Sequence, residues 1–468
     1  MRTAGKLSAA IEILTDFNAR RVPLKTAIAD WGRGNRYAGA KDRAWISGLC
    51  LDVLRKKHSL SAAMQSDNSR ALVLGAARFL WAMPIDELAE HATEEPHGPG
   101  TLSEDEKKYL QSSHPSFPAK GEIEKEAEII ELASSPCMAH EFESGADHIA
   151  EHITGNFPEW MTPHIARAFG ERAANVMAGF SERADVDLRL NTIKAEPEKS
   201  LKALGSIKGQ AIPVLTTAAR INAPDPSQKA PAVTVIPAFN KGWVEVQDLG
   251  SQIAAAAAGD IKGAQVLDYC AGGGGKTLAL AALMENTGQL YAYDNDARRL
   301  KPLYARAKRA GVRNLQVRSP AGDEGLDDLA GKMDVVFVDA PCTGAGTWRR
   351  HPDTKWRLTE KQLERRMVEQ DTVLREASRF VKPGGRMVWV TCSFLMEENE
   401  DRLTAFLAEH SEFSFSPTLD AIKSSGLLTE EGNAALNLCV TPDRALRITP
   451  DKLRADGFFV AILERASA

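Results

Sequence analysis

At 468 residues, with 43% hydrophobic and 26% charged residues, the chain has the length of two or three domains and the composition of an ordinary soluble globular protein. Its formal net charge of −5 excludes a protein coated in basic surface, although a local basic groove remains open. No apolar run approaches the ~20 residues that span a bilayer, so no membrane partner is expected.

The cysteines and the amino terminus indicate a cytoplasmic protein. The six cysteines lack the CxxC spacing of zinc sites and the pattern of a small disulfide-rich domain. The amino-terminal stretch MRTAGKLSAAIEILTDF carries charged residues too early to leave the apolar core of a signal peptide. We therefore expect a reducing cytoplasm, no metal site and a monomer.

The first 92 residues predict helices. Apolar residues recur at three- and four-residue spacing, with charges between them, in AGKLSAAIEILTDF, AKDRAWISGLCLDVLRKKHSL and NSRALVLGAARFLWAM. Proline, glycine and acidic residues then break the pattern in HATEEPHGPGTLSEDEKK, which predicts a linker or an exposed loop. We expect a helical domain with its linker over residues 1–140.

A small α+β module is predicted over residues 141–237. Helical spacing resumes at 157–180, in FPEWMTPHIARAFGERAANVMAGF. The stretch DVDLRLNTIK then alternates polar and apolar residues, as a half-buried strand does. The module ends in the loop NAPDPSQKAPAV, which is rich in proline.

Short apolar strands alternate with helices over residues 238–468. The strands are QVLDYC, GQLYAYD, LQVRS, MDVVFVDAPC and GRMVWVTCS, and the helices between them include KTLALAALMEN, DARRLKPLYARAKRAG and EKQLERRMVEQDTVLREASRFV. This alternation predicts an α/β domain with a Rossmann-like parallel sheet that is covered on both faces. Ligands of such sheets bind at the carboxyl ends of the strands.

A glycine-rich loop, LDYCAGGGGKTLAL, follows the first of these strands. Four consecutive glycines, Gly272 to Gly275, let the backbone approach a ligand and leave amide hydrogens free. A P-loop ending at Gly275 would need glycine at Cys270, and a dinucleotide fingerprint would need glycine at Thr277 or Leu278. A nucleoside site without the pyrophosphate pattern remains, for which S-adenosylmethionine is the common ligand. A turn without any ligand is the alternative.

Acidic residues after the next strands extend the predicted cofactor site. Asp294 ends the second strand and suits the ribose hydroxyls, whereas neighbouring Asp296 suits a helix N-cap. Asp323 follows the third strand and is either a contact of the adenine amino group or a surface acid. The predicted cofactor-binding residues are Cys270, Ala271, Gly272, Gly273, Gly274, Gly275, Lys276, Asp294, Asp323 and Asp339.

Two cysteines follow the fourth and fifth strands. Cys342 comes directly after DVVFVDAP, and Cys392 ends GRMVWVTCS. These strands are neighbours in a doubly wound sheet, so both thiols should open into one cleft beside the glycine loop. A single cysteine there is most often an inert small hydrophobe. A thiol that follows Asp-Ala-Pro can instead act as a nucleophile or a base.

Three of these motifs resemble those of a known family. DYCAGGGGKT, DAPCTGAGTWRRHPDTKW and VTCSFLMEENE are similar to the signatures of RNA cytosine-C5 methyltransferases, and most similar to the bacterial 16S rRNA methyltransferase B family. The resemblance extends over residues 183–466, and the helical first domain resembles, more weakly, a NusB-like RNA-binding domain. The family usually has Ala-Pro where this chain has Gly272-Gly273, so we expect a more flexible loop, whose effect on cofactor affinity the sequence leaves open.

The resemblance implies methylation of cytosine carbon 5 with S-adenosylmethionine. By resemblance, the thiolate of Cys392 adds to carbon 6, which activates carbon 5, and Cys342 helps to release the product. Asp339 is expected to contact the cofactor, the base or both. Because a thiol ionises near pH 8.5, it needs a positive neighbour, for which Lys276, Arg349 and Arg350 are the candidates.

RNA is the implied substrate. We expect 16S rRNA, with tRNA as an alternative substrate and a non-catalytic RNA-binding assembly factor as an alternative function. Intact Cys342 and Cys392 speak against a non-catalytic protein. The basic stretch 348–357 is favoured for phosphate contact because it follows Cys342, whereas the basic helix 298–309 is as readily a solvated face. The target base must leave its stack to reach a thiol.

Overall fold

The computed structural model describes residues 1–112, 114, 117, 151–225, 228, 231–320 and 325–467. These residues form two compact units. The helical unit comprises the described residues of Met1–Arg183, Pro224–Ala230 and Trp348–Arg357. The sheet unit comprises those of Ala184–Ala223, Pro231–Thr347 and Leu358–Ala468. The boundary at residue 140 lies outside the described residues, and the division into three domains stays a prediction.

Amphipathic helices build the helical unit, as their apolar spacing predicts. Leu7, Ile13 and Leu14 of the first helix are buried in one core with Leu49 and Val53 of the third. Its α-helices are α1 (Thr3–Arg20), α2 (Leu24–Gly34), α3 (Ala40–Arg55), α4 (Lys57–Met64), α5 (Ser69–Gly75), α6 (Ile85–Thr93), α7 (Glu104–Gln111), α9 (Glu151–Thr154), α10 (Thr162–Phe169), α11 (Ala173–Phe180) and α17 (Pro352–Arg357). None of the helices in the described part of the chain is both long and apolar enough to cross a membrane.

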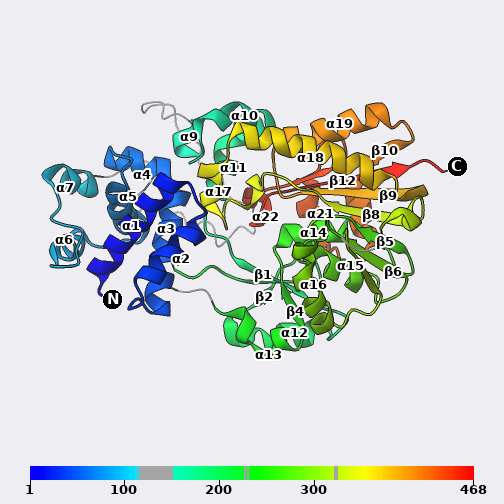
Figure 1. Ribbon diagram of the computed structural model, residues 1–468, viewed down its shortest axis with the longest axis horizontal. Helices are drawn as coiled ribbons and strands as arrows, with labels where there is room; N and C mark the ends of the chain where they lie inside the picture. Colours follow the sequence, from blue (N-terminus) through cyan, green and yellow to red (C-terminus); the bar gives the residue numbers. More distant parts are fainter. Residues whose placement is uncertain are drawn as a thin grey trace. The chain divides into compact units, whose positions relative to one another are not determined.

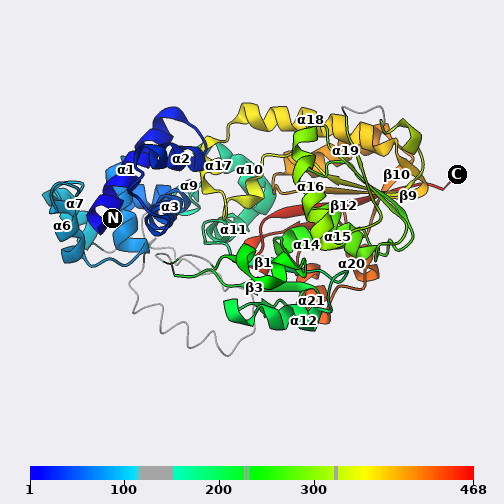
Figure 2. The same ribbon diagram turned by 60° about the horizontal axis from the view of Figure 1, so that its bottom comes forward.

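A small antiparallel sheet opens the sheet unit. Its strands are β1 (Val186–Leu190), β2 (Gln210–Ala211), β3 (Ala218–Ile221) and β4 (Val244–Val246), in the order β2-β3-β1-β4. Figure 2 shows β1 and β3 with helix α12 (Pro197–Ala203) beside them. Leu188 and Leu190 are buried in the core of this sheet, which confirms the predicted strand in DVDLRLNTIK. The expectation of half-burial is wrong, because Asp187 and Arg189 on the other face are buried as well.

The large sheet has the order β10-β12-β9-β8-β5-β6-β7, with β11 paired to β12. Its strands are β5 (Gln265–Asp268), β6 (Gln289–Tyr293), β7 (Leu315–Arg318), β8 (Met333–Asp339), β9 (Val381–Thr391), β10 (Phe413–Ser416), β11 (Leu446–Ile448) and β12 (Phe458–Arg465). Strands β5 to β9 pair in parallel, which confirms the predicted Rossmann-like sheet, whereas β12 pairs antiparallel with β9.

Helices cover both faces of this sheet (Figure 1). Helices α14 (Leu249–Ala256), α15 (Gly275–Leu283) and α16 (Ala297–Ala310) lie on one face, and α18 (Glu360–Ser378) and α19 (Glu400–Glu409) lie on the other. Val335 and Phe337 of β8 are buried with α14 and α15, whereas Val336 and Val338 are buried with α18 and α19. Burial on both faces explains the continuous apolar run in this strand.

The strand order places the predicted site residues at one edge. Strand β5 lies between β6 and β8, so the chain direction across the sheet reverses at β5. This is the switch point where ligands of doubly wound sheets bind. The glycine loop follows β5, Asp294 follows β6, Cys342 follows β8 and Cys392 follows β9.

Candidate active site

The glycine loop joins β5 to α15 in a conformation that needs glycine twice. Gly272 has φ of +51° and Gly274 has φ of +83°, both in the left-handed region that side chains disfavour. A Cβ at Gly274 would also collide with the side chain of Leu303 in α16. The backbone N–H of Gly272 donates to Asp294 Oδ2 at 3.0 Å, and Arg306 Nη1 donates to the carbonyl of Gly273 at 2.7 Å. These bonds hold the loop, and the greater flexibility expected from Gly272-Gly273 stays a prediction.

Asp294 lies where the sequence predicts it, beside this loop. Its side chain is 1% exposed. It accepts the Gly272 N–H and, at 3.0 Å, the N–H of Asp296, and Arg299 lies 3.2 Å away. Asp296 is the N-cap of α16, so the two neighbouring acids have the separate positions that the sequence suggested. Asp323 lies outside the described residues.

Asp268 ends β5, and no role was predicted for it from the sequence. Its carboxylate is fully buried, and its Oδ2 accepts a hydrogen bond from Thr277 Oγ1 at 2.6 Å. Its Oδ1 is buried without a hydrogen-bond partner. Burial raises the pKa of Asp268 to about 7, and the charges of Asp339 and Asp294 contribute. In the sequence, only the position of this carboxylate within the apolar strand QVLDYC could have indicated its burial.

Replacing Asp268 with Asn should remove a pH-dependent loss of stability. Because the pKa of Asp268 is about 7 in the folded protein and 3.8 ordinarily, the folded state binds more protons between these values. The free energy of unfolding therefore falls as pH rises through this window, by on the order of 4 kcal/mol. The melting temperature of Asp268→Asn relative to the wild type should rise from pH 5 to pH 8. A constant difference would contradict the raised pKa.

The two predicted thiols meet. Strands β8 and β9 pair in parallel with Asp339 opposite Val390, and Cys342 Sγ lies 3.4 Å from Cys392 Sγ. The contact with Cys392 is the largest cause that raises the pKa of the Cys342 thiol well above its ordinary value, and burial and the charge of Glu398 add to it. Cys342 therefore keeps its proton at neutral pH, and its sulfur lies within hydrogen-bond distance of Cys392. The structure thus brings the two thiols together, whereas a shared cleft stays a prediction.

Lys276 is the cation beside this pair. Its Nζ lies 2.7 Å from Asp339 Oδ2. Burial alone would lower the pKa of Lys276, but the charge and hydrogen bond of Asp339 outweigh burial and raise it, and Cys392 contributes in the same direction. Lys276 is thus charged at neutral pH and interacts with Cys392. Of the three cations proposed to assist the thiolate, Lys276 has this electrostatic link.

The basic stretch 348–357 is largely buried within the helical unit. Arg349 is 3% exposed and Lys355 is fully buried. Lys355 Nζ donates to the carbonyl of Arg55 at 3.3 Å, and Trp356 Nε1 donates to the carbonyl of Leu54 at 2.6 Å. Burial lowers the pKa of Lys355 well below its ordinary value. The expectation that this stretch contacts RNA is therefore wrong for Arg349 and Lys355.

Most basic residues of α16 form ion pairs with acidic residues. Arg306 lies 3.3 Å from Glu245, and Arg309 forms a second ion pair with the same carboxylate. Arg298 pairs with Asp296 at 2.9 Å. Lys301 and Lys308 are exposed. The structure thus favours the alternative in which this helix face has a structural and solvated role.

Glu398 and Asn399 are further residues to which the sequence analysis gave no role. Both belong to the motif VTCSFLMEENE and both are fully buried. Glu398 accepts hydrogen bonds from the residue after Cys342, and Asn399 bonds to the residues around Cys392. In the sequence, only the polar run that ends the motif VTCSFLMEENE could have indicated them, and polar residues alone do not indicate burial.

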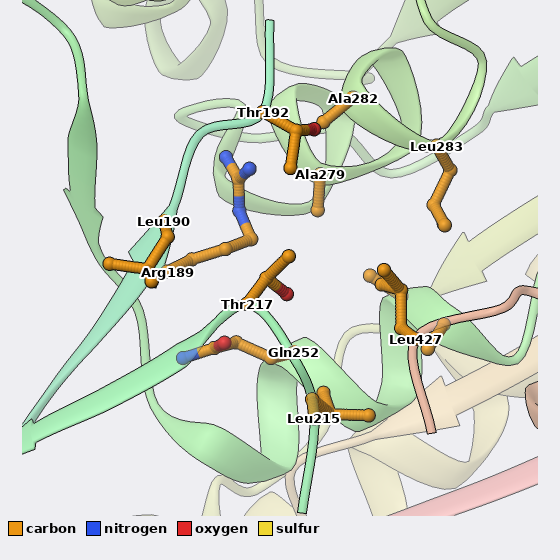
Figure 3. A pocket seen from close by; sticks show the side chains of 12 residues that line it. Arg189, Leu190, Thr192, Leu215, Thr217, Gln252, Ala279, Ala282, Leu283 and Leu427 are labelled. Atoms are coloured by element: carbon orange, nitrogen blue, oxygen red, sulfur yellow. The ribbon is translucent and has the colours of Figure 1, made fainter. Parts of the chain in front are cut away.

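Figure 3 shows a small cavity of the sheet unit, and neither thiol is among the residues that line it. It has a volume of about 40 Å³ and contains none of the predicted site residues. Arg189 Nη1 and Nη2 and Gln252 Oε1, which belong to its lining residues, are buried without a hydrogen-bond partner. A space of this size suits ordered water that satisfies these atoms. The cavity is therefore not the active-site cleft.

The chain is similar to proteins described as rRNA methyltransferases. A family model described as 16S rRNA methyltransferase RsmB/F matches residues 259–464. The ribosomal RNA small subunit methyltransferase B of Photorhabdus laumondii is 30% identical over 313 residues, which are 66% of this chain and 66% of that protein. The protein of the same description from Klebsiella pneumoniae is 29% identical over 375 residues, or 79% of this chain and 82% of that protein.

A solved structure shows the same fold. The crystal structure of PH0851 has a TM-score of 0.66 at 23% identity, over 99% of this chain and 99% of that chain. The residues matched by the family model include the glycine loop, both thiols, Lys276 and Glu398. The chain therefore belongs to the RsmB/F family of S-adenosylmethionine-dependent rRNA (cytosine-5)-methyltransferases.

Proposed function

We propose that this protein methylates carbon 5 of a cytosine in 16S rRNA through a covalent intermediate on Cys392. The observation that carries the proposal is the pair of unequal thiols, 3.4 Å apart, at the carboxyl ends of β8 and β9. One thiol holds its proton, and the other interacts with a buried lysine. Packing alone gives no reason for this asymmetry.

The residues around the glycine loop fit S-adenosylmethionine. Asp268 and Asp339 end β5 and β8, and Asp294 directly follows β6. Lys276 pairs with Asp339 and Arg299 lies 3.2 Å from Asp294, whereas the buried Oδ1 of Asp268 has no hydrogen-bond partner. A ligand with an ammonium group would supply the donor that Asp268 lacks. The loop backbone and Asp294 would hold the nucleoside, and Asp268 would accept from the ammonium.

Attack begins at Cys392. Its thiolate adds to carbon 6 of the cytosine, and the electron pair of the 5,6 double bond makes carbon 5 nucleophilic. When bound, the cofactor supplies an electrophilic methyl group to carbon 5. Lys276 stabilises the thiolate before attack, and Asp339 positions Lys276 through the 2.7 Å ion pair. About a third of the Asp339 side chain is exposed, so it can also contact the base.

Release needs a base for the proton on carbon 5. Once Cys392 is a thioether, its sulfur no longer carries negative charge, and the largest cause of the raised pKa of Cys342 is removed. Cys342 can then lose its own proton to solvent and take the proton from carbon 5. The electron pair of that C–H bond re-forms the 5,6 double bond. The carbon–sulfur bond breaks, and Cys392 leaves as a thiolate.

Bisulfite sequencing of total RNA from a deletion strain tests the substrate. A single cytosine of 16S rRNA should become unprotected in the deletion strain and protected again on complementation. Loss of protection in a tRNA would make the alternative substrate correct. Unchanged protection in both RNA classes would favour the non-catalytic assembly factor.

A further prediction concerns the affinity for the cofactor. Asp294→Ala should weaken S-adenosylmethionine binding about 10- to 100-fold, because a hydrogen bond to a charged group contributes about 1.5–3 kcal/mol. Isothermal titration calorimetry measures this change. Since Asp294 also accepts the Gly272 N–H, Asp294→Asn is the matched control, which keeps an acceptor of similar shape. Unchanged affinity in both variants would remove Asp294 from the site.

The free thiols also bear on where in the cell the protein is located. Two free thiols 3.4 Å apart remain reduced only where the surroundings are reducing, so we assign the protein to the cytoplasm. We also keep the expectation of a monomer, which size-exclusion chromatography with light scattering tests. A dimer peak at micromolar concentration would contradict that expectation.

A further inference from the structure

A tight turn after β9 brings two buried polar residues between the thiol loops. The chain runs from Thr391 through Cys392 into the short 3₁₀ helix Met396–Glu398, and α19 begins at Glu400. Glu398 and Asn399 are both fully buried. Because a buried polar side chain without partners costs about 1–3 kcal/mol, their partners indicate what holds them there.

Glu398 binds the loop that carries Cys342. Its Oε1 accepts the backbone N–H of Thr343 at 2.7 Å, and its Oε2 accepts the Thr343 hydroxyl at 2.5 Å. Gln370 Nε2 of α18 donates to Glu398 Oε1 at 3.2 Å and to the carbonyl of Pro341 at 2.9 Å. Thr343 is thus bonded to the Glu398 carboxylate directly, and Pro341 is linked to the same carboxylate through the Gln370 amide.

Asn399 binds the loop that carries Cys392. Its Oδ1 accepts from the hydroxyl of Thr391 at 2.6 Å. Its Nδ2 donates to the carbonyls of Ser393 at 3.0 Å and Leu395 at 2.8 Å. The residues on both sides of Cys392 are therefore tied to Asn399. Adjacent residues of one turn hold the two loops whose sulfur atoms touch.

The charges around the thiols differ in sign. The carboxylate of Glu398 acts on Cys342 and raises the pKa of its thiol, after the larger effects of Cys392 and burial. Lys276, paired with Asp339, interacts with Cys392. Negative charge beside Cys342 disfavours its thiolate, so the two thiols have different electrostatic surroundings.

We propose that Glu398 and Asn399 are positioning residues that hold the thiol loops in contact, and that Glu398 also determines which thiol ionises. The inference rests on the proposed function for its catalytic meaning. Asn399 fixes the geometry of the Cys392 loop. Glu398 fixes the Cys342 loop, and its negative charge favours the protonated form of Cys342.

Thiol alkylation of the full-length protein, without RNA, tests whether Glu398 determines which thiol ionises. Iodoacetamide reacts with thiolates, and peptide mass spectrometry gives the rate at each cysteine from pH 6 to pH 9. In the wild type, Cys392 should react at least ~10-fold faster than Cys342 at pH 7.5. In Glu398→Gln, which keeps the shape and loses the charge, this ratio should fall at least ~3-fold. An unchanged ratio would overturn the proposal.

Glu400→Gln is the matched control. Glu400 lies on the same turn, is also buried and pairs with Arg447 rather than with the Cys342 loop. The control should leave the alkylation ratio within ~2-fold of the wild type. An equal change in both variants would mean that any buried carboxylate of this turn has the effect, which contradicts a specific role of Glu398.

Thr343→Val keeps the test decisive if Glu398→Gln does not fold. The variant removes the hydroxyl donor to Glu398 but leaves the carboxylate in place. Methylation should slow ~10-fold in kcat with KM for RNA within ~2-fold, and Thr343→Ser should restore the rate. Equal losses in Thr343→Val and Thr343→Ser would contradict the positioning role. If the wild type methylates no RNA, the proposed function fails, but the alkylation ratio still tests the inference.

Discussion

Cys342→Ala should accumulate a covalent protein–RNA complex that survives denaturing electrophoresis, whereas Cys392→Ala should form none. With Cys392 intact, the variant can still attack carbon 6 and methylate carbon 5. It lacks the base that removes the carbon-5 proton, so release should slow about 10²- to 10⁴-fold, the range for general base catalysis. The complex should contain methylated RNA in stoichiometric amount.

Cys392→Ala should lose methylation by on the order of 10⁴-fold or more, because it removes the nucleophile on which all later steps depend. The double variant should behave like Cys392→Ala, since release has no meaning without attack. A complex trapped in Cys392→Ala instead would exchange the two roles. Methylation intact in both single variants would mean that the thiols at 3.4 Å are only packing residues.

The thiol pair was predictable from the sequence for a definite physical reason. Val335 to Val338 form an apolar run that only a strand buried on both faces explains, and such strands lie inside parallel sheets. Strand adjacency then places Cys342 near Cys392 without knowledge of any side-chain contact. The same reasoning placed Asp294 beside the glycine loop.

The burial of charged residues was not predictable in this way. Arg349 and Lys355 look like surface residues in the sequence, yet both are buried in the helical unit. Lys355 donates to the carbonyl of Arg55 and lies over the rings of Trp348 and Trp356. Arg55 lies 300 positions from Lys355 in the sequence, so the local pattern carries no information about this contact.

The same limit applies to the acids of the site. Asp268 and Glu398 gain their importance from burial and from their hydrogen bonds, since Thr277 and Thr343 donate to them. A carboxylate in an apolar strand or directly after one is a usable signal, but it does not distinguish a ligand contact from a loop anchor. Only the hydrogen-bond partners seen in the structure make that distinction.

The remaining large effect is expected at Lys276. Lys276→Met should lower kcat at pH 7 about 10- to 100-fold, because an opposite charge near a thiol changes its ionisation by about 1–2 pH units. Its loss should reduce the fraction of Cys392 present as thiolate at neutral pH. Activity should therefore recover toward the wild-type value near pH 9, which a pH–rate profile from pH 6 to pH 10 measures. Lys276→Arg, which keeps the charge, should retain most activity at pH 7.

The ion pair with Asp339 makes a second variant necessary. Removing Lys276 alone leaves the Asp339 carboxylate, 2.7 Å from the former ammonium, without its partner and adds negative charge beside the thiolate. Lys276→Met combined with Asp339→Asn removes both charges. If the cation acts on Cys392 directly, the double variant should still need high pH. If Lys276 only neutralises Asp339, the double variant should regain the wild-type profile. A loss that is equal at every pH in Lys276→Met would instead assign the lysine to cofactor binding, because only an effect on thiol ionisation disappears as the pH rises.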